Sequence, residues 1–343
     1  MRYIESKKIG NVESFCPDNG DYAYIKGQKG YLYIDGVLLE KDDAPLELSL
    51  RGKYMYAWYG SGMFELYEGH TLLNSIERNV ILLNEQTQYI GKTYMEFNPY
   101  RKGYNFASPI DEQLILPEFV PCRLYVEDDT IIAYNNFSGE FKRINTQTKT
   151  LWEFPLSSLG GTEYEPGKTD KIDKILGIAH GNIWFYTKFY RLVALDLETG
   201  KKVYSLDCFG VYLDEVTKDI FAIASNGWTI IDTQTSTIKE DYFFSEEDPE
   251  GMGQYESVYK PLLQGDYFTF LGEKEEDYGG IRRVGIFDYK ARKLVWEYEV
   301  ISEEEFDETR NQLVPPQPLY MSGDKLYIKD IKDNLHIFER EDI

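Results

Sequence analysis

Histidine serves in both acid–base catalysis and metal binding, so the three histidines are the first residues to test for chemistry. They are His70, His180 and His336, and none has a second histidine or a cysteine at the spacing of a metal site. His180 occupies an Ala-His-Gly-Asn turn before a strand-like run, and His336 lies inside such a run. We therefore interpret all three histidines as structural.

Other catalytic signatures are also missing from the sequence. It contains no Gly-x-Ser-x-Gly elbow, His-Glu-x-x-His pair, P-loop or EF-hand loop. Asp170 and Asp173 could supply two carboxylates, which is too few for a calcium site. Among 59 acidic residues, some pairs will match the carboxylate pairs that cleave glycosidic bonds by chance alone. We expect a protein without enzymatic activity, metal or other cofactor, and keep a glycan-processing propeller as the alternative.

The cysteines and the apolar segments indicate the cellular compartment in which the protein resides. Cys16, Cys122 and Cys208 are odd in number and lack Cys-x-x-Cys spacing, which argues against a disulfide framework and a zinc site. Residues 1–15 lack the apolar run of a signal peptide, and no stretch is long and apolar enough to span a membrane. We expect a cytoplasmic protein. A periplasmic or surface scaffold whose leader has been removed is the alternative.

The charge of the chain limits its partners. Lys and Arg total 37 and Asp and Glu total 59, which gives a net charge of −22. Such a surface repels nucleic acid and anionic membranes and attracts basic proteins. We therefore expect a basic protein partner, no nucleic acid and no membrane, although solubility alone would also explain the charge.

A short strand motif recurs along the chain and must position these charges. In the motif, apolar residues two apart end at a short polar residue, as in LVALD at residues 192–196. Each copy follows another strand-like run, and most precede a turn and a third run, which is the order of an antiparallel sheet. The copies end at Asp35, Glu68, Asn145, Asp196, Asp232, Asp288 and Glu339, with Asn84 as a further candidate.

Repeats of this size indicate an all-β fold, a β-propeller that forms a single domain over residues 1–343. From Asn145 to Glu339 the copies recur about every 36 to 56 residues, and one sheet of three or four strands must stack on its neighbours to bury its faces. We expect seven blades within a range of six to eight, because residues 68–125 match poorly. The last copy is a third strand, so we predict that the N-terminal RYIESKKI completes the last blade and closes the ring.

The segment LVALDLETGKKVY resembles the repeat of the quinoprotein-dehydrogenase-like propellers, a WD-like superfamily with the approximate signature Ala-x-Asp-x-x-Thr-Gly-x-x-x-Trp. Ala194, Asp196, Thr199 and Gly200 match, and Tyr204 takes the place of the tryptophan. Other copies carry matches at Asn145, Thr148, Trp152, Asp232, Thr235, Asp288 and Trp296. The resemblance implies the fold, with these residues docking one blade on the next. Enzymes of the family use a quinone, calcium, a catalytic aspartate and adjacent cysteines, and no residues here match that site, which implies a non-enzymatic member.

Four acidic segments are expected at one end of the propeller. Residues 157–173, 245–256 and 301–312 follow outermost strands, and residues 272–280 follow a second strand, so alternation of chain direction sends all four to the same end. We expect Arg282 and Arg283 to pair with the acids of the 272–280 segment. The candidate partner-binding residues are Tyr164, Glu165, Glu246, Glu247, Asp248, Tyr255, Glu275, Glu276, Asp277, Tyr278, Glu303, Glu304, Glu305 and Phe306.

Long loops on one side of a rigid scaffold are where binding usually occurs, with aromatic residues as anchors and acids steering a basic partner. The sequence therefore favours a non-catalytic protein-binding propeller, for example an immunity or inhibitor protein that blocks a basic toxin or enzyme. The alternative is a carbohydrate-binding or glycan-processing propeller with carboxylates and tyrosines in the central funnel.

Overall fold

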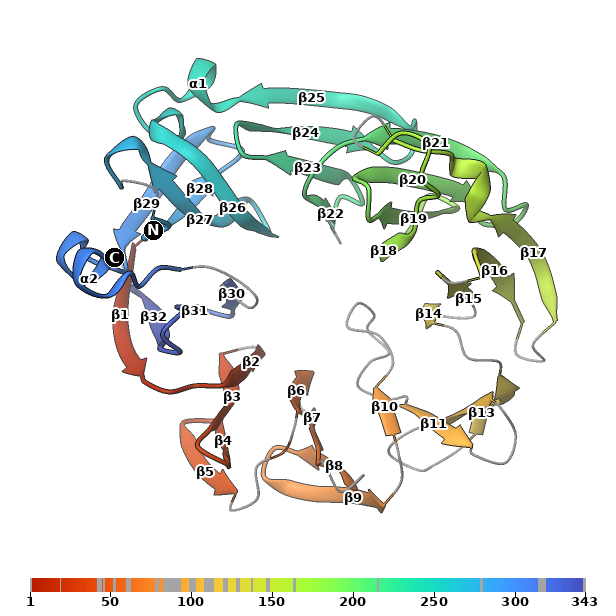
Figure 1. The fold of residues 1–343 in the computed structure, drawn as a ribbon, viewed down its shortest axis with the longest axis horizontal. Helices are drawn as coiled ribbons and strands as arrows, with labels where there is room; N and C mark the ends of the chain where they lie inside the picture. Colours follow the sequence, from red (N-terminus) through yellow and green to blue (C-terminus); the bar gives the residue numbers. More distant parts are fainter. Residues whose placement is uncertain are drawn as a thin grey trace.

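The computed structural model describes most of the chain between residues 2 and 341. The gaps in this description are residues 19, 42–44, 46, 52–53, 60–62, 78–79, 83–93, 99–102, 108–113, 120–122, 128–129, 137, 146–148, 163–164, 215, 278–279 and 314–318. The described strands form eight four-stranded antiparallel sheets, which follow one another around a ring as the blades of a β-propeller (Figure 1). No helix in this described part is long and apolar enough to cross a membrane.

The first four blades occupy the N-terminal half of the chain. Blade 1 contains β2 (Ser14–Asp18), β3 (Asp21–Lys26), β4 (Lys29–Ile34) and β5 (Val37–Lys41). Blade 2 contains β6 (Glu47–Arg51), β7 (Tyr54–Trp58), β8 (Met63–Glu68) and β9 (Thr71–Glu77). Blade 3 contains β10 (Val80–Leu82), β11 (Tyr94–Asn98), β12 (Gly103–Ala107) and β13 (Leu114–Phe119). Blade 4 contains β14 (Arg123–Glu127), β15 (Thr130–Asn135), β16 (Glu140–Ile144) and β17 (Thr150–Pro155).

The other four blades complete the ring. Blade 5 contains β18 (Ile172–Ala179), β19 (Asn182–Thr187), β20 (Arg191–Asp196) and β21 (Lys202–Asp207). Blade 6 contains β22 (Val211–Leu213), β23 (Ile220–Ala224), β24 (Gly227–Asp232) and β25 (Thr237–Phe243). Blade 7 contains β26 (Tyr255–Gln264), β27 (Tyr267–Lys274), β28 (Arg283–Asp288) and β29 (Lys293–Glu299). Blade 8 contains β30 (Leu319–Ser322), β31 (Lys325–Lys329), β32 (Leu335–Glu341) and β1 (Arg2–Ile9).

Short helices occur only in connections between the described strands. They are η2 (Leu156–Leu159), α1 (Phe244–Glu247), η3 (Met252–Gln254), η4 (Glu275–Asp277) and α2 (Glu303–Thr309). α2 begins at Ser302, whose hydroxyl accepts a hydrogen bond from the backbone N–H of Glu305. The acidic connection predicted over residues 301–312 therefore contains a short helix, which the sequence analysis does not predict.

The described strands form eight blades, one more than the expected seven and at the upper limit of the range of six to eight. The expected count of seven gives one blade to each motif copy from Asp35 to Glu339 and places the further candidate at Asn84 in the same blade as Glu68. Glu68 ends β8, the third strand of blade 2, whereas Val80–Leu82 forms β10, the first strand of blade 3. Asn84 itself lies outside the described residues. The third strand of blade 3, β12, has the sequence GYNFA, which lacks the motif, so sequence reasoning counted one blade too few.

The N-terminal strand closes the ring, as predicted. β1 pairs antiparallel with β32 and is the outermost strand of blade 8, so the first and last strands of the chain share one sheet (Figure 1). Tyr3 on β1 is 2% exposed and packs against Trp296 of blade 7, with 5.5 Å between the ring centroids. The seam is therefore held by backbone pairing and by apolar packing onto the neighbouring blade.

The core lies between blades, because each inner strand is covered on both faces. β20 is buried at four successive residues, whereas no residue of the outer strand β21 is buried. Aromatic rings bridge the interfaces: Phe141 and Phe185 join blades 4 and 5 at 4.9 Å between centroids, and Trp228 and Phe287 join blades 6 and 7 at 5.0 Å. Burial on both faces explains why these strands read as continuous apolar runs.

Two of the repeat residues named from the family resemblance, Trp152 and Gly200, dock blade 4 on blade 5, as that resemblance implied, whereas Thr148 lies outside the described residues. The Trp152 indole N–H of blade 4 donates to the carbonyl oxygen of Leu197 in blade 5 at 2.7 Å. Gly200 has φ +68, and an added Cβ would lie 2.6 Å from Trp152 Cδ2. Asp196 accepts from the backbone N–H and hydroxyl of Thr199, which caps the turn. Because Gly200 has no side chain, the ring of Trp152 in the preceding blade can pack directly against the Thr199–Gly200 turn.

Candidate partner-binding site

The four acidic segments lie in connections that leave the blades at one end of the propeller, hereafter the loop end. Residues 157–173, 245–256 and 301–312 each join an outermost strand to the next blade, and residues 272–280 join β27 to β28. Three of these segments are in contact at blade 7. An added Cβ on Gly280 would lie 2.6 Å from Phe306, and Leu313 N–H donates to the carbonyl oxygen of Ile281 at 2.7 Å.

The fourth segment is tied to blade 5. The guanidinium of Arg191 donates from Nη1 to the carbonyl oxygen of Leu159 at 2.5 Å and from Nη2 to that of Gly161 at 2.7 Å. Its Nε donates to Asp207 at 2.7 Å. Residues 157–173 therefore pack on the β19–β20 turn and lie away from the three segments that meet at blade 7.

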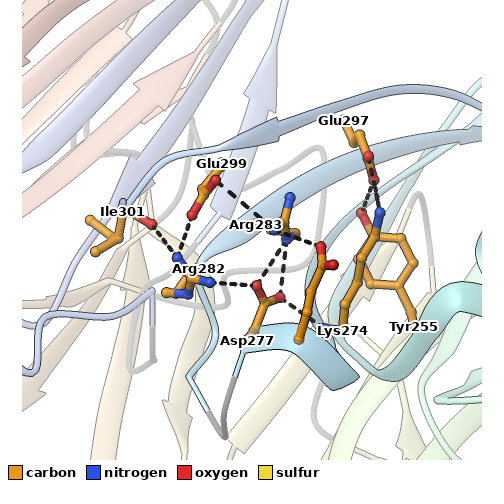
Figure 2. A network of polar contacts seen from close by, with 9 residues as sticks. Tyr255, Lys274, Asp277, Arg282, Arg283, Glu297, Glu299 and Ile301 are labelled. Atoms are coloured by element: carbon orange, nitrogen blue, oxygen red, sulfur yellow. Dashed lines mark hydrogen bonds and ion pairs between the residues drawn. The ribbon is translucent and has the colours of Figure 1, made fainter. Parts of the chain in front are cut away.

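A buried ion-pair network anchors the loop end of blade 7 (Figure 2). Asp277, at the end of η4, is fully buried and accepts from Arg282 Nη2 at 2.8 Å and from Arg283 Nε at 3.0 and 3.1 Å. Arg282 is 2% exposed and also ion-pairs with Glu299. The expectation that the two arginines pair with the acids of this segment is confirmed, and they are not available to a ligand.

A second group lies beside the network (Figure 2). Glu297 accepts a hydrogen bond from the Tyr255 hydroxyl at 2.7 Å and forms an ion pair with Lys274 Nζ at 2.8 Å. Burial raises the pKa of Glu297, but the bonds from Lys274 and Tyr255 outweigh it and hold that pKa below the usual range. Burial and the Glu297 bond together raise the pKa of Tyr255. Tyr255 is therefore a neutral donor and Glu297 an ionised acceptor near neutral pH.

An open hollow of about 690 Å³ lies above this second group. Its wall is formed by η3 with the start of β26 and by the end of β27 with η4, and its lining residues are Gly253, Gln254, Tyr255, Glu256, Lys274, Glu275 and Glu276. The side chains of Glu256 and Glu275 are exposed, and no ion pair of either occurs in the described part of the chain. Glu256 and Glu275 therefore give the hollow uncompensated negative charge that a bound ligand would face.

The candidate residues divide by their exposure. Those exposed at the loop end are Glu246, Glu247, Glu275, Glu276, Glu303 and Glu304. Glu165, Asp248 and Glu305 are half-buried and hold local structure; Asp248, for example, accepts from the backbone N–H groups of Met252 and Leu294. Tyr164 and Tyr278 lie outside the described residues.

Three candidates are buried, which corrects the expectation that they face a partner. Tyr255 and Phe306 are each 7% exposed, and Asp277 is fully buried. Tyr255 packs edge-on against Phe270 with 5.0 Å between centroids, and Phe306 joins the apolar cluster between blades 7 and 8. Aromatic residues in long acidic segments were expected as interface anchors, but here they fasten those segments to the core.

An exposed aromatic pair that sequence reasoning missed lies at the same end. Tyr190 is 43% exposed and Phe209 is 40% exposed, and their ring centroids are 4.7 Å apart. Tyr190 belongs to the β19–β20 turn and Phe209 to the segment between β21 and β22, which are both connections of the loop end. Tyr190 has φ +64, an unusual conformation for a bulky residue. These connections, residues 188–190 and 208–210, are short and carry no acidic residue, so the pattern of long acidic segments does not point to them.

Comparison with known proteins supports the fold alone. No family model matches the chain, and no curated protein matches it. Among solved structures, the C-terminal WD40 domain of Sif2 has a TM-score of 0.61 at 10% identity and covers 99% of this chain and 99% of its own. Saccharomyces cerevisiae Sqt1 has a TM-score of 0.60 at 9% identity, with 99% and 98% covered. The computationally designed Ika8 protein has a TM-score of 0.57 at 9% identity, with 96% of each chain covered.

These likenesses extend over nearly the whole chain and agree with the β-propeller fold of the structure. At identities near 10% they carry no information about ligand or activity, because propellers host many unrelated functions.

Proposed function

We propose that this propeller is a non-catalytic protein that binds a basic protein partner through the exposed carboxylates of its loop end. The specific form we favour is a cytoplasmic immunity or inhibitor protein that blocks a basic toxin or enzyme. Neither nucleic acid nor a membrane surface is expected to bind, because the net charge of −22 repels both.

The observation that carries the proposal is the group of exposed acids around blade 7. Glu246, Glu275, Glu303 and Glu304 are exposed there, and none forms an ion pair with another described residue. The buried Asp277 network and the packed Phe306 hold the segments that carry these acids. A rigid, uncompensated set of charges suits fast and selective capture of a cationic surface.

The aromatic pair Tyr190–Phe209 supplies apolar area at the same end. Exposed aromatic rings are enriched at protein interfaces, where they contribute more to affinity than rim charges do. Because Tyr255 and Phe306 are buried, we assign the role of apolar anchor at the partner interface to Tyr190 and Phe209. A partner that engages both regions must span blades 5 to 7.

The test compares two variants of equal net charge. The first carries Glu246→Gln, Glu303→Gln and Glu304→Gln at the loop end. The second carries Asp35→Asn, Asp266→Asn and Asp324→Asn in turns at the opposite end, where these side chains are exposed or ion-paired on the surface.

Immobilised wild-type protein is used to capture partners from lysate of the source cell at low and high salt. A basic partner should be retained at low salt by the wild type and by the opposite-end variant. The loop-end variant should bind it at least about threefold more weakly, because each exposed ion pair contributes about 0.2–1 kcal/mol. Equal loss in both variants, or no salt-sensitive basic partner at all, would contradict the proposal.

A further inference from the structure

His336 lies at the seam of the ring between two carboxylates. It belongs to β32 and is 1% exposed. Its Nδ1 lies 2.7 Å from Glu5 Oε1 on β1, and its Nε2 lies 3.2 Å from Asp330 Oδ2, just after β31. The imidazole therefore joins the N-terminal strand to the rest of blade 8.

The geometry requires a proton on both ring nitrogens. An ionised carboxylate oxygen only accepts hydrogen bonds, and Asp330 already accepts from the backbone N–H groups of Lys332 and Asn334. A neutral imidazole would turn one bare nitrogen lone pair toward a carboxylate lone pair. The arrangement is satisfied by the charged imidazolium, with one N–H donated to Glu5 and the other to Asp330.

The same cluster reaches the loop end through Asn311. This residue is fully buried, and its Nδ2 donates to Asp330 Oδ2 and to Glu305 Oε1, each at 2.8 Å. Glu305 belongs to α2, which also carries the exposed Glu303 and Glu304. A continuous series of contacts therefore runs from β1 through His336, Asp330 and Asn311 to α2.

The charged and titratable groups around His336 come from four elements. β1 contributes Glu5 and Lys8, the segment after β31 contributes Asp330, β29 contributes Tyr298 near Glu5, and α2 contributes Glu305, which lies 3.9 Å from Lys8 Nζ. Burial lowers the pKa of His336, but the bonds to Asp330 and Glu5 outweigh it and raise that pKa above its usual value.

We propose that His336 is a proton-dependent latch that fastens both the N-terminal strand and the acid-bearing helix α2 to blade 8. Loss of the proton places two facing carboxylates around a neutral ring, which weakens the Glu5 contact and the Asp330–Asn311–Glu305 series together. The consequence for binding rests on the proposed function, since α2 then carries the partner-binding acids. The latch itself does not depend on any partner.

The direction of the pH dependence follows from the folded and unfolded states. The unfolded His336 titrates near 6.5, and the folded residue titrates at a higher pH. Its stabilising contribution is complete below 6.5 and is lost as pH rises through the folded pKa. Asp330 has its pKa held well below the usual range, so it stays ionised throughout this alkaline transition.

The test follows the ring protons and the backbone of the full chain across pH. Nuclear magnetic resonance of labelled histidine rings should show His336 titrating above 6.5, the ordinary value for histidine. Hydrogen exchange, corrected for intrinsic rates, should show β1 and residues 303–313 losing protection at the midpoint of the His336 titration. Peptides of blade 5 should keep their protection.

Two neutralising variants sharpen the test. Glu5→Gln should lower the midpoint by about one pH unit, because a carboxylate in contact shifts a pKa by about 1–3 units. Glu341→Gln removes the same charge from the same strand pair, where it contacts Arg2, and should leave the midpoint unchanged. His336→Gln should abolish the transition, and Glu5→Gln remains informative if that variant does not fold.

Any of three results would overturn the latch: His336 titrating at or below 6.5, β1 and α2 losing protection at different midpoints, or an unchanged midpoint in Glu5→Gln. None of these measurements involves a partner, so the latch and the proposed function can fail separately. A partner whose affinity for the intact protein does not change across the transition would refute the coupling to binding while leaving the binding itself established.

Discussion

The substitution Asp277→Asn should destabilise the protein strongly although it changes little in size. It removes the carboxylate that Arg282 and Arg283 share, and Arg282 is only 2% exposed. Breaking a buried ion pair by removing one partner generally costs about 3–5 kcal/mol, because the remaining charge is uncompensated. Glu299 still faces Arg282, so we expect a loss at the lower end, about 3 kcal/mol.

This loss can be measured as a shift in the calorimetric midpoint. An unfolding entropy of about 2.1 cal/mol/K per residue, over 343 residues, converts about 3 kcal/mol into a decrease of about 4 °C. Glu276→Gln is the matched control, since Glu276 belongs to the same short helix and pairs with Arg283 while its side chain is 67% exposed. It should lower the midpoint by less than about 1.5 °C, as surface pairs contribute at most about 1 kcal/mol.

A double variant distinguishes the effect of an uncompensated Arg282 charge from the effect of losing the Asp277 contacts alone. If an uncompensated Arg282 causes the loss, adding Arg282→Met to Asp277→Asn should recover part of the stability, because apolar replacements of buried ion pairs are often neutral. Additive losses in the double variant, or equal shifts for Asp277→Asn and Glu276→Gln, would refute the reasoning.

Three further outcomes are expected. Gly200→Ala should lower the free energy of unfolding by at least about 1 kcal/mol more than Gly181→Ala. Both glycines have positive φ, but only at Gly200 would an added Cβ clash with a neighbour, the ring of Trp152; equal losses in denaturant titrations would contradict this. Deleting residues 2–9 should expose blade 8 and lower the calorimetric midpoint by several degrees, and an unchanged midpoint would show that β1 does not hold the seam. Burial raises the pKa of the Cys208 thiol to about 12, so mass spectrometry should find it unalkylated at pH 8 until denaturant is added, and rapid native alkylation would contradict its burial.

The strand repeat could be predicted from the sequence because its signals are local. Alternating apolar residues, a short polar residue and a turn define each hairpin within about a dozen positions, as LVALD and LETG do around Asp196. Closure by the N-terminal strand also followed, since a last blade ending in a third strand leaves one position for another strand. The blade count failed where the local signal was weak, in β12.

The sequence carries a local signal for α2. Ser302 followed three residues later by Glu305 is a helix-start pattern, and it would have placed Phe306 on the first turn of a short helix. An apolar side chain on a helix of charged residues points toward the core. Burial of Phe306 could therefore have been expected, whereas the position of Gly280 against its ring could not.

Outside blade 3, the sequence by itself determined the strand repeat and its order within each blade, together with the closure at β1 and the end of the propeller at which the acidic segments emerge. These features depend on alternation along the chain, which neighbouring residues encode. Only the tertiary structure decided which acids at that end are exposed and which form ion pairs within the protein. Asp277 pairs with Arg282 and Arg283, and Asp330 pairs with His336. Such pairings join residues that the packing of strands and blades brings together, and their charges are compensated only when distances of about 3 Å are set by the packed ring.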